Sequence, residues 1–267
     1  MLRKILKYDL RLLSKSILPI QLSVLGISLT GCVFLFFIIG LAGMENPTAQ
    51  IIGNLLIMGY YSIFQLILTI SMFATIILAL YRYYKSVFTD EGYLTMVIPV
   101  DPAVTFAAKY LSLLITAVVS AAVTFVSVII AFVLPSMLHF SYEVIVELKS
   151  MIDFMGMNNI LLFILRGGAI ALTSELLSLT AAMTAITVGS LIVKRFKLLI
   201  SYLLYEGSGY LISTVIMIIV IVLAVLLWQV PELSATLITL ILVIFTAGAT
   251  VGLYFLNVFL LRKKFNI

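Results

Sequence analysis

The sequence predicts an all-α integral membrane protein with six membrane-spanning helices and both termini in the cytoplasm. Of its 267 residues, 64% are hydrophobic and 10% are charged, whereas about 25% of the residues in an ordinary soluble domain are charged. Long windows without a charged or histidine side chain divide the chain, and basic residues gather at alternate ends of these windows. This small number of charged groups cannot cover the core of a soluble fold. The main solvent of the chain must therefore be lipid.

The six expected spans are windows long enough to cross a hydrocarbon core of about 30 Å, which takes roughly 20 helical residues. We expect them at about 18–44, 56–81, 110–135, 169–193, 198–228 and 236–260. The polar stretch Glu206-Gly207-Ser208-Gly209 interrupts the fifth window. The fifth span therefore begins either near Leu198, which we favour, or near Tyr210.

The distribution of basic residues predicts the orientation. Fourteen of the sixteen Lys and Arg residues lie at the N-terminus, in the loops after spans two and four, or at the C-terminus, and only Lys149 and Arg166 lie on the opposite side. The positive-inside rule places the richer side in the cytoplasm, and an even number of spans brings both termini there. The first apolar window is longer than the roughly 7 to 15 residues of a cleaved signal peptide core, so we expect this span in the mature protein.

Residues 1–17 are expected to form an amphipathic helix in the inner membrane interface. Apolar residues at helical spacing are Leu2, Ile5, Leu6, Leu10, Leu13 and Ile17, and the basic residues between them are Arg3, Lys4, Lys7, Arg11 and Lys15. Such a helix directs its basic side chains toward anionic headgroups. The alternative is a basic tail without helical structure.

Two loops carry most of the remaining charged residues. The outer loop, residues 136–158, has apolar residues spaced at three and four, which predicts an amphipathic helix on the outer surface. His139 and Glu143 in this loop have no third ligand and no HExxH motif, so we expect no metal site.

The cytoplasmic loop, residues 82–102, is predicted to contain a short separate helix. Thr89 or Asp90 can cap it, and Pro99 and Pro102 prevent it from running into the third span. The loop is rich in aromatic side chains, namely Tyr83, Tyr84, Phe88 and Tyr93. These suit either an anchor in the groove of a partner protein or the aromatic belt of a membrane interface.

Three ionisable residues, Arg166, Glu175 and Glu206, are candidates for a pathway or for pairing inside the bundle, because such groups are costly within a membrane. Arg166 is expected at the outer end of the fourth span, in a structural role with its charge near the interface. In an unbroken helix it lies about 14 Å from Glu175, which is too far for pairing. Glu206 lies either inside the fifth span or at the inner interface, depending on where that span begins.

No catalytic or nucleotide-binding motif occurs in the sequence. It lacks HExxH, GxSxG and the P-loop, and it contains one histidine and one cysteine, Cys32. We therefore expect no catalytic residue, no metal and no cofactor in this chain, and any ATP hydrolysis must occur in another subunit. No basic face alternates with base-stacking aromatic residues, so we expect no nucleic-acid partner.

The loop motif carries a resemblance to a known family. Phe88-Thr89-Asp90-Glu91-Gly92-Tyr93-Leu94 is followed by Ile98-Pro99-Val100-Asp101-Pro102. Together with six spans and a basic N-terminal helix, this resembles the ABC-2 type permeases of bacterial ABC exporters, which often show F-x-D-E-G-Y-L and then an L-P-V-S-P-like turn. Asp101 here replaces the serine. The resemblance covers the whole chain and implies one transmembrane permease domain over residues 1–267.

The resemblance also implies partners and a location. The loop would hold a coupling helix that docks on a separate ATP-binding subunit through Phe88, Thr89, Asp90, Glu91, Gly92 and Tyr93. Two permease chains, identical or different, would pair above two ATPase subunits that bind ATP and magnesium, in the bacterial cytoplasmic membrane. Relatives usually place re-entrant elements between spans five and six, whereas Trp228-Gln229-Val230-Pro231-Glu232-Leu233 is too short for long ones.

The sequence and the resemblance indicate the cargo less directly than they indicate the partners. Spans dominated by Ile, Leu, Val and Ala favour a hydrophobic or amphipathic cargo, and the resemblance points to an amphipathic peptide, a toxin or a peptide antibiotic, with a drug, lipid or ion as alternatives. An ion-coupled secondary transporter would use Glu175 and Glu206 as ionisable sites, but we find no internal repeat. A membrane-bound enzyme or a scaffold is the remaining class, and co-purification of an ATPase separates these possibilities.

Overall fold

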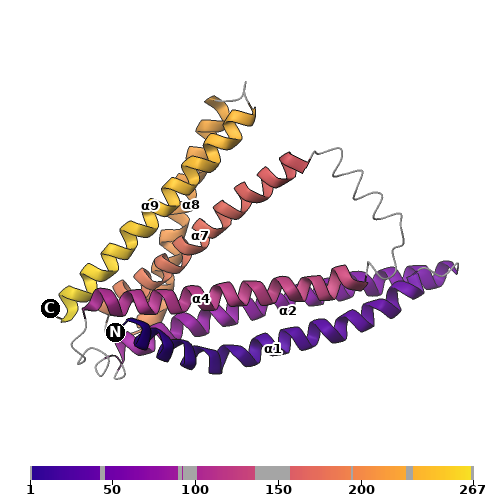
Figure 1. Cartoon of the computed structure of the whole chain (residues 1–267), viewed down its shortest axis with the longest axis horizontal. Coiled ribbons are helices and arrows are strands. Elements are labelled where there is room, and N and C mark those ends of the chain that lie inside the picture. Colours follow the sequence, from indigo (N-terminus) through magenta and orange to yellow (C-terminus); the bar gives the residue numbers. More distant parts are fainter. Residues whose placement is uncertain are drawn as a thin grey trace. The chain divides into compact units, whose positions relative to one another are not determined.

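The computed structural model describes residues 2–42, 46–89, 92, 101–135, 157–193, 195–226 and 231–265. Over these ranges every regular element is helical and none is a strand (Figure 1). The helices are α1 (Leu2–Ala42), α2 (Pro47–Phe88), α4 (Pro102–Val128), α7 (Met157–Ile192), α8 (Lys197–Leu226) and α9 (Pro231–Phe265). A π-helical turn, Ile129–Val133, continues α4.

Six helices in the described part of the chain are long and apolar enough to cross a membrane. Each expected span falls on a different one of them, which confirms the all-helical class and the number of span-forming helices. The chain is therefore a multi-pass helical membrane protein by length and composition. Its orientation remains a prediction.

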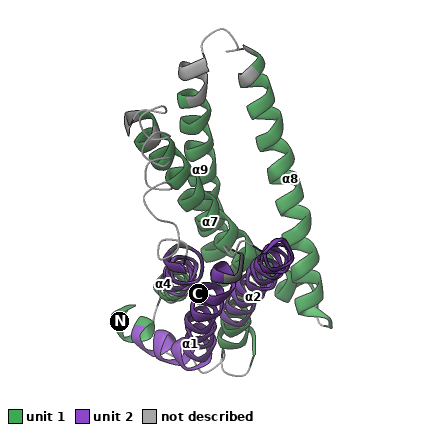
Figure 2. Cartoon of the chain, turned by 90° about the vertical axis from the view of Figure 1, so that its right-hand side faces the viewer, with its two compact units in different colours: residues 1–6, 80–114, 158–267 green, residues 7–79, 115–157 purple. Residues whose placement is uncertain are grey.

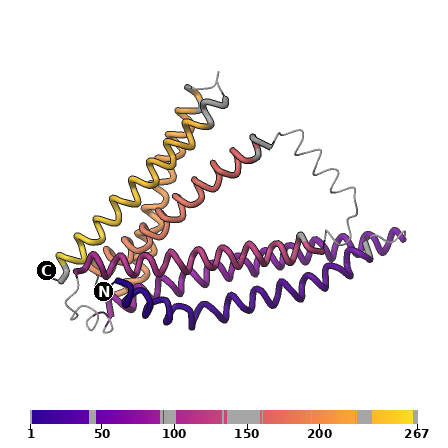
Figure 3. Tube along the Cα trace, viewed as in Figure 1, coloured from indigo at the N-terminus to yellow at the C-terminus, as the bar shows by residue number. Residues whose placement is uncertain are grey.

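The helix α1 contains both the predicted amphipathic segment and the first span without a break. Its trace is continuous in Figure 3. The helix runs for 41 residues, and Pro19 lies inside it. Its five basic residues before Ser16 are exposed, whereas Leu13 and Ile17 are buried. The amphipathic pattern is therefore present, and the position of this segment in the membrane interface remains a prediction.

The helices α2 and α4 begin with the same local signal, an asparagine or aspartate followed by proline. Asn46 Oδ1 accepts a hydrogen bond of 3.1 Å from the backbone N–H of Thr48, and Pro47 begins α2. Asparagine and aspartate cap helix N-termini in this way, and proline suits the first helical position because its missing N–H would have no helical partner. As a result α2 begins nine residues before the expected start of its span at residue 56.

The fifth helix continues through the polar interruption. The helix α8 runs from Lys197 to Leu226 and includes Glu206 and the two glycines that follow it. The helix therefore contains both possible starts of the fifth span, near Leu198 and near Tyr210, and the start within the membrane remains a prediction. The membrane depth of Glu206 remains a prediction.

The chain divides into two compact units, coloured separately in Figure 2. Unit 2 comprises residues 7–79 and 115–157 and contains parts of α1, α2 and α4. Val24, Phe64, Leu68 and Ala131 form its buried cluster, and Tyr60, Val128 and Phe132 pack against them.

Two close contacts join the helices of unit 2. Gln21 donates hydrogen bonds to Ser120 Oγ at 2.9 Å and to Thr75 Oγ1 at 3.3 Å, and so links α1 to α4 and α2. A Cβ atom on Gly31 would lie 2.0 Å from the hydroxyl oxygen of Tyr60. Glycine at position 31 therefore makes room for this aromatic side chain.

Unit 1 comprises residues 1–6, 80–114 and 158–267. It contains the end of α2, the start of α4, and α7, α8 and α9. The helices α7 and α8 approach closely at Gly189 and Ser201. A Cβ atom on Gly189 would lie 2.3 Å from Ser201 Oγ and 3.0 Å from the Ser201 backbone nitrogen. This unit holds the ends of the loop between α2 and α4 and most of the candidate site residues.

Candidate functional site

The first end of the loop between α2 and α4 is held tightly against α2. Phe88 is 9% exposed, and Thr89 donates a hydrogen bond from its hydroxyl to the carbonyl oxygen of Lys85. The backbone N–H of Gly92 donates to the carbonyl oxygen of Thr89 at 2.8 Å. A Cβ atom on Gly92 would lie 2.5 Å from the carbonyl carbon and oxygen of Val87, so a side chain does not fit there.

This geometry gives three of the six predicted contact residues an internal role. Phe88 and Gly92 are buried and Thr89 is half-buried, so they shape the turn that leaves α2. Their contact with an ATPase remains a prediction. Asp90, Glu91 and Tyr93, together with any helix that Asp90 would cap, lie outside the described residues.

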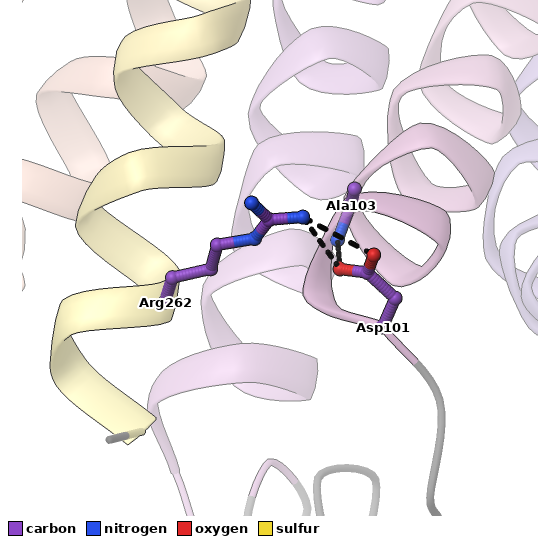
Figure 4. A network of polar contacts seen from close by, with 3 residues as sticks. All are labelled: Asp101, Ala103 and Arg262. Atoms are coloured by element: carbon purple, nitrogen blue, oxygen red, sulfur yellow. Dashed lines mark hydrogen bonds and ion pairs between the residues drawn. The ribbon is translucent and has the colours of Figure 1, made fainter. Parts of the chain in front are cut away.

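The second end of the loop is fixed by Asp101 (Figure 4). Its Oδ1 accepts a hydrogen bond of 3.0 Å from the backbone N–H of Ala103, so Asp101 caps α4 and Pro102 is its first residue. The helix therefore begins eight residues before the expected start of its span at residue 110. Both carboxylate oxygens also lie near Nη2 of Arg262 in α9, at 3.3 and 3.2 Å.

The charge of Asp101 is favoured by these contacts. The hydrogen bond from the Ala103 N–H and then the Arg262 guanidinium hold the pKa of the Asp101 carboxyl below its usual range. The ion pair is half-exposed, with side-chain exposures of 51% and 50%, so water screens it. The main contact of the Asp101 carboxylate is thus the cap of α4, and the screened ion pair with Arg262 in α9 is the weaker one.

A buried relay of hydrogen bonds surrounds the last turns of α2. Lys109 Nζ in α4 donates to Ser86 Oγ at 2.8 Å, and Ser86 donates to the carbonyl oxygen of Tyr83 at 3.0 Å. The hydroxyl of Tyr83 lies 2.9 Å from Thr187 Oγ1 in α7. Because Thr187 donates its own proton to the Met183 carbonyl at 2.8 Å, Tyr83 is the donor of the pair.

These contacts tie three helices together next to the loop. Lys109, Tyr83 and Thr187 are 3%, 3% and 0% exposed. Aromatic rings continue the cluster, since the Phe106 ring lies 6.4 Å from Tyr83 and 5.2 Å from Tyr254 in α9. Side-chain contacts therefore link the ends of the loop to α7 and α9.

The candidate ionisable residues within the spans occupy different surroundings. Arg166 Nη2 donates to Thr236 Oγ1 at 2.8 Å and so links α7 to α9. The helix α7 is unbroken at Gly167 and Gly168, so Arg166 and Glu175 lie about 14 Å apart along it, as expected. The described contact of Arg166 is thus with a hydroxyl of α9, and its place at the outer end of the span remains a prediction.

Glu175 and Glu206 are both exposed within span-forming helices. The hydroxyls of Ser178 in α7 and Tyr205 in α8 lie 2.9 Å apart. Glu175 and Glu206 lie three residues and one residue from this contact along their helices.

No group of metal-ligating residues occurs within the described ranges. His139 and Glu143, for which we expected no metal, lie outside those ranges, as does the predicted outer-surface helix.

Several residues of this site were missed by the sequence analysis. Asp101 was noted only as a departure from the family pattern, although Asp-Pro is a recognisable helix start. The spacing of Thr180, Thr184 and Thr187 marks one polar face of α7, and all three are buried. No sequence signal pairs Arg262 with a residue 161 positions earlier.

The arrangement defines a class of protein: a multi-pass helical membrane protein with a buried polar network at the ends of the loop between α2 and α4. Comparisons with protein-family models, curated proteins and solved structures find no match to this chain.

Proposed function

We propose that this chain is the membrane permease subunit of an ATP-driven exporter of the ABC-2 type. The observation that carries the proposal is the loop motif from Phe88 to Leu94, set between helix ends that are fixed to neighbouring helices. A loop that transmits work from a partner needs firm attachment to the helices that it moves. The buried relay at Tyr83 and Lys109 supplies such an attachment.

The partners follow from the same proposal. Two ATP-binding subunits would dock on the cytoplasmic loops of two permease chains, with Asp90, Glu91 and Tyr93 as the main contacts. ATP and magnesium would bind only in the partner subunits. The complex would lie in a bacterial cytoplasmic membrane with both termini of this chain inside, and residues 1–17 at the inner interface.

The cargo is proposed to be hydrophobic or amphipathic, with an amphipathic peptide, toxin or peptide antibiotic as the first candidate. The described spans expose mainly Ile, Leu, Val and Phe side chains, which suit the apolar side of such a cargo. Glu175 and Glu206 would offer carboxylates to its polar or cationic side.

The test is co-purification of an ATPase with the tagged chain in mild detergent. We compare the intact protein with Glu91→Ala/Tyr93→Ala and with a matched control in the outer loop, Tyr142→Ala/Glu143→Ala. The proposal expects a Walker-motif subunit with the intact protein and the control, and its loss or uncoupling in the first variant. Equal association in both variants would contradict the proposed contacts, and no ATPase with the intact chain would refute the proposal.

An ion-coupled secondary transporter is the second candidate, favoured by the two exposed carboxylates, Glu175 and Glu206, in span-forming helices. Ion gradients should then drive uptake or efflux in vesicles that contain only this chain. Glu206→Gln should abolish that activity. Transport that requires ATP and a second subunit would exclude it.

A further inference from the structure

One face of α1 changes from basic to apolar along its length. Lys7, Arg11 and Lys15 are exposed at intervals of four residues. Exposed apolar side chains then follow on the same helix, namely Leu18 (53%), Leu22 (57%) and Leu29 (58%). At 3.6 residues per turn these six side chains fall within an arc of about 80°.

The opposite face of the same segment is enclosed by the protein. Asp9, Leu13 and Ile17 are 8%, 4% and 5% exposed. An amphipathic helix that inserts into a membrane surface needs its apolar face free to enter the lipid. Here Leu13 and Ile17 are buried and the apolar residues before them are half-buried, so the exposed side of the segment is its basic side.

The change from basic to apolar coincides with a polar boundary. Ser14 and Ser16 are exposed, and Pro19 has no N–H to donate to the carbonyl oxygen of Lys15. A carbonyl without a helical partner is costly in hydrocarbon and acceptable where water reaches it. A headgroup level near Lys15 would suit this boundary, because the 25 residues from Leu18 to Ala42 extend about 37 Å, enough for a hydrocarbon core of about 30 Å.

We propose that this face of α1 is a binding track for an anionic phospholipid. The phosphate lies at Arg11 and Lys15, and an acyl chain lies along Leu18 and Leu22. The order of the basic half and the apolar half selects the ligand. A phospholipid presents an anionic headgroup and then a hydrocarbon chain, in the same order as the track. A free phosphate or an acidic protein surface would use only the basic half. This inference is independent of the proposed export function.

The experiment uses a tryptophan reporter on the apolar half of the track. Leu22→Trp is made in a Trp228→Phe background, since Trp228 is the one tryptophan of the sequence. The full-length protein is reconstituted in phosphatidylcholine vesicles that contain either brominated phosphatidylglycerol or additional brominated phosphatidylcholine at the same mole fraction. Quenching of the tryptophan fluorescence then reports which lipid occupies the track.

Three variants in the reporter background identify the binding residues. Arg11→Gln/Lys15→Gln removes two charges from the track. Arg195→Gln/Lys263→Gln is the matched control, because it removes the same charge from exposed residues elsewhere. Arg11→Lys/Lys15→Arg keeps both charges and tests whether charge, rather than one side-chain shape, selects the lipid.

The track predicts stronger quenching by the brominated anionic lipid in the reporter protein, the control and the charge-keeping variant. Removal of Arg11 and Lys15 should lower this preference by up to roughly 30-fold at low salt, the effect of two basic contacts at the membrane surface. Glycerol phosphate in solution should leave the quenching unchanged.

Four results would overturn the proposal. Equal quenching of the reporter protein by both lipids would show no selectivity, and an equal fall in the control would show only a general effect of net charge. Loss of preference in the charge-keeping variant would show a structural role for these residues. Displacement by glycerol phosphate would assign a free-anion site. If lipid selectivity is absent and Arg11→Gln/Lys15→Gln instead loses a co-purified subunit, the basic face belongs to a protein partner.

Discussion

The hydrogen bond between Tyr83 and Thr187 allows a quantitative test of the buried relay. Tyr83→Phe removes the donor and leaves Thr187 still bonded to the Met183 carbonyl. The expected cost is the net value of one hydrogen bond, about 0.5 to 1.5 kcal/mol. Thr187→Val keeps the shape of the side chain but leaves the Tyr83 hydroxyl buried without its acceptor, which costs about 1 to 3 kcal/mol.

The double variant separates these effects. In the Tyr83→Phe background, Thr187→Val leaves no buried hydroxyl without an acceptor. The double variant Tyr83→Phe/Thr187→Val should therefore be no less stable than Thr187→Val alone. The coupling energy should be about 0.6 kcal/mol or more, the mean for hydrogen bonds between membrane helices. The assay is reversible unfolding in mixed micelles with increasing SDS, followed by circular dichroism.

Additive single effects would refute this reasoning, because they would mean that the two hydroxyls do not interact. The order of the single variants is a second check. A Tyr83→Phe protein less stable than Thr187→Val would contradict the assignment of Tyr83 as the donor.

Three further predictions concern single residues. Asp101→Asn keeps the helix cap but removes the charge. Because the pKa of Asp101 is lowered in the folded protein, its charge stabilises the fold above the usual aspartate pKa of about 3.9. This contribution is lost as the pH falls through the lower folded pKa. The difference in unfolding midpoint between wild type and Asp101→Asn should therefore shrink from pH 6 to pH 3, and a constant difference would exclude the charge as its cause. Gly31→Ala places a Cβ atom 2.0 Å from the Tyr60 hydroxyl and should cost about 1 to 3 kcal/mol in the same unfolding assay. Gly92→Ala meets backbone at 2.5 Å and should disturb the loop, measured as faster proteolysis after α2. Gly26→Ala, which meets no atom within 4 Å, is the matched control for both glycine variants and should behave as wild type, apart from a small propensity effect.

The helix boundaries show where local signals were sufficient and where they were underused. The apolar windows located six helices, yet α2 and α4 begin well before their expected spans. A hydropathy window reports the length that fits lipid, whereas a helix extends to its cap. Asn46-Pro47 and Asp101-Pro102 carried that second signal in the sequence.

The first helix shows the limit of an amphipathic pattern. Spacing alone separates an apolar side from a basic side in residues 1–17, and the exposed basic side chains agree with it. The pattern does not say whether lipid or protein covers the apolar side. The burial of Leu13 and Ile17 answers that question, because it depends on residues far away in the chain.

By itself the sequence determined that this chain needs lipid as a solvent, forms six apolar helices and carries one distinctive loop between the second and third. These properties depend on composition and on periodicity within single segments. Only the tertiary structure decided that Tyr83 bonds to Thr187, that Asp101 faces Arg262, and that Arg166 finds a threonine rather than a carboxylate. Such pairs join residues 70 to 161 positions apart, and their partners are set by how helices pack, which local spacing does not encode.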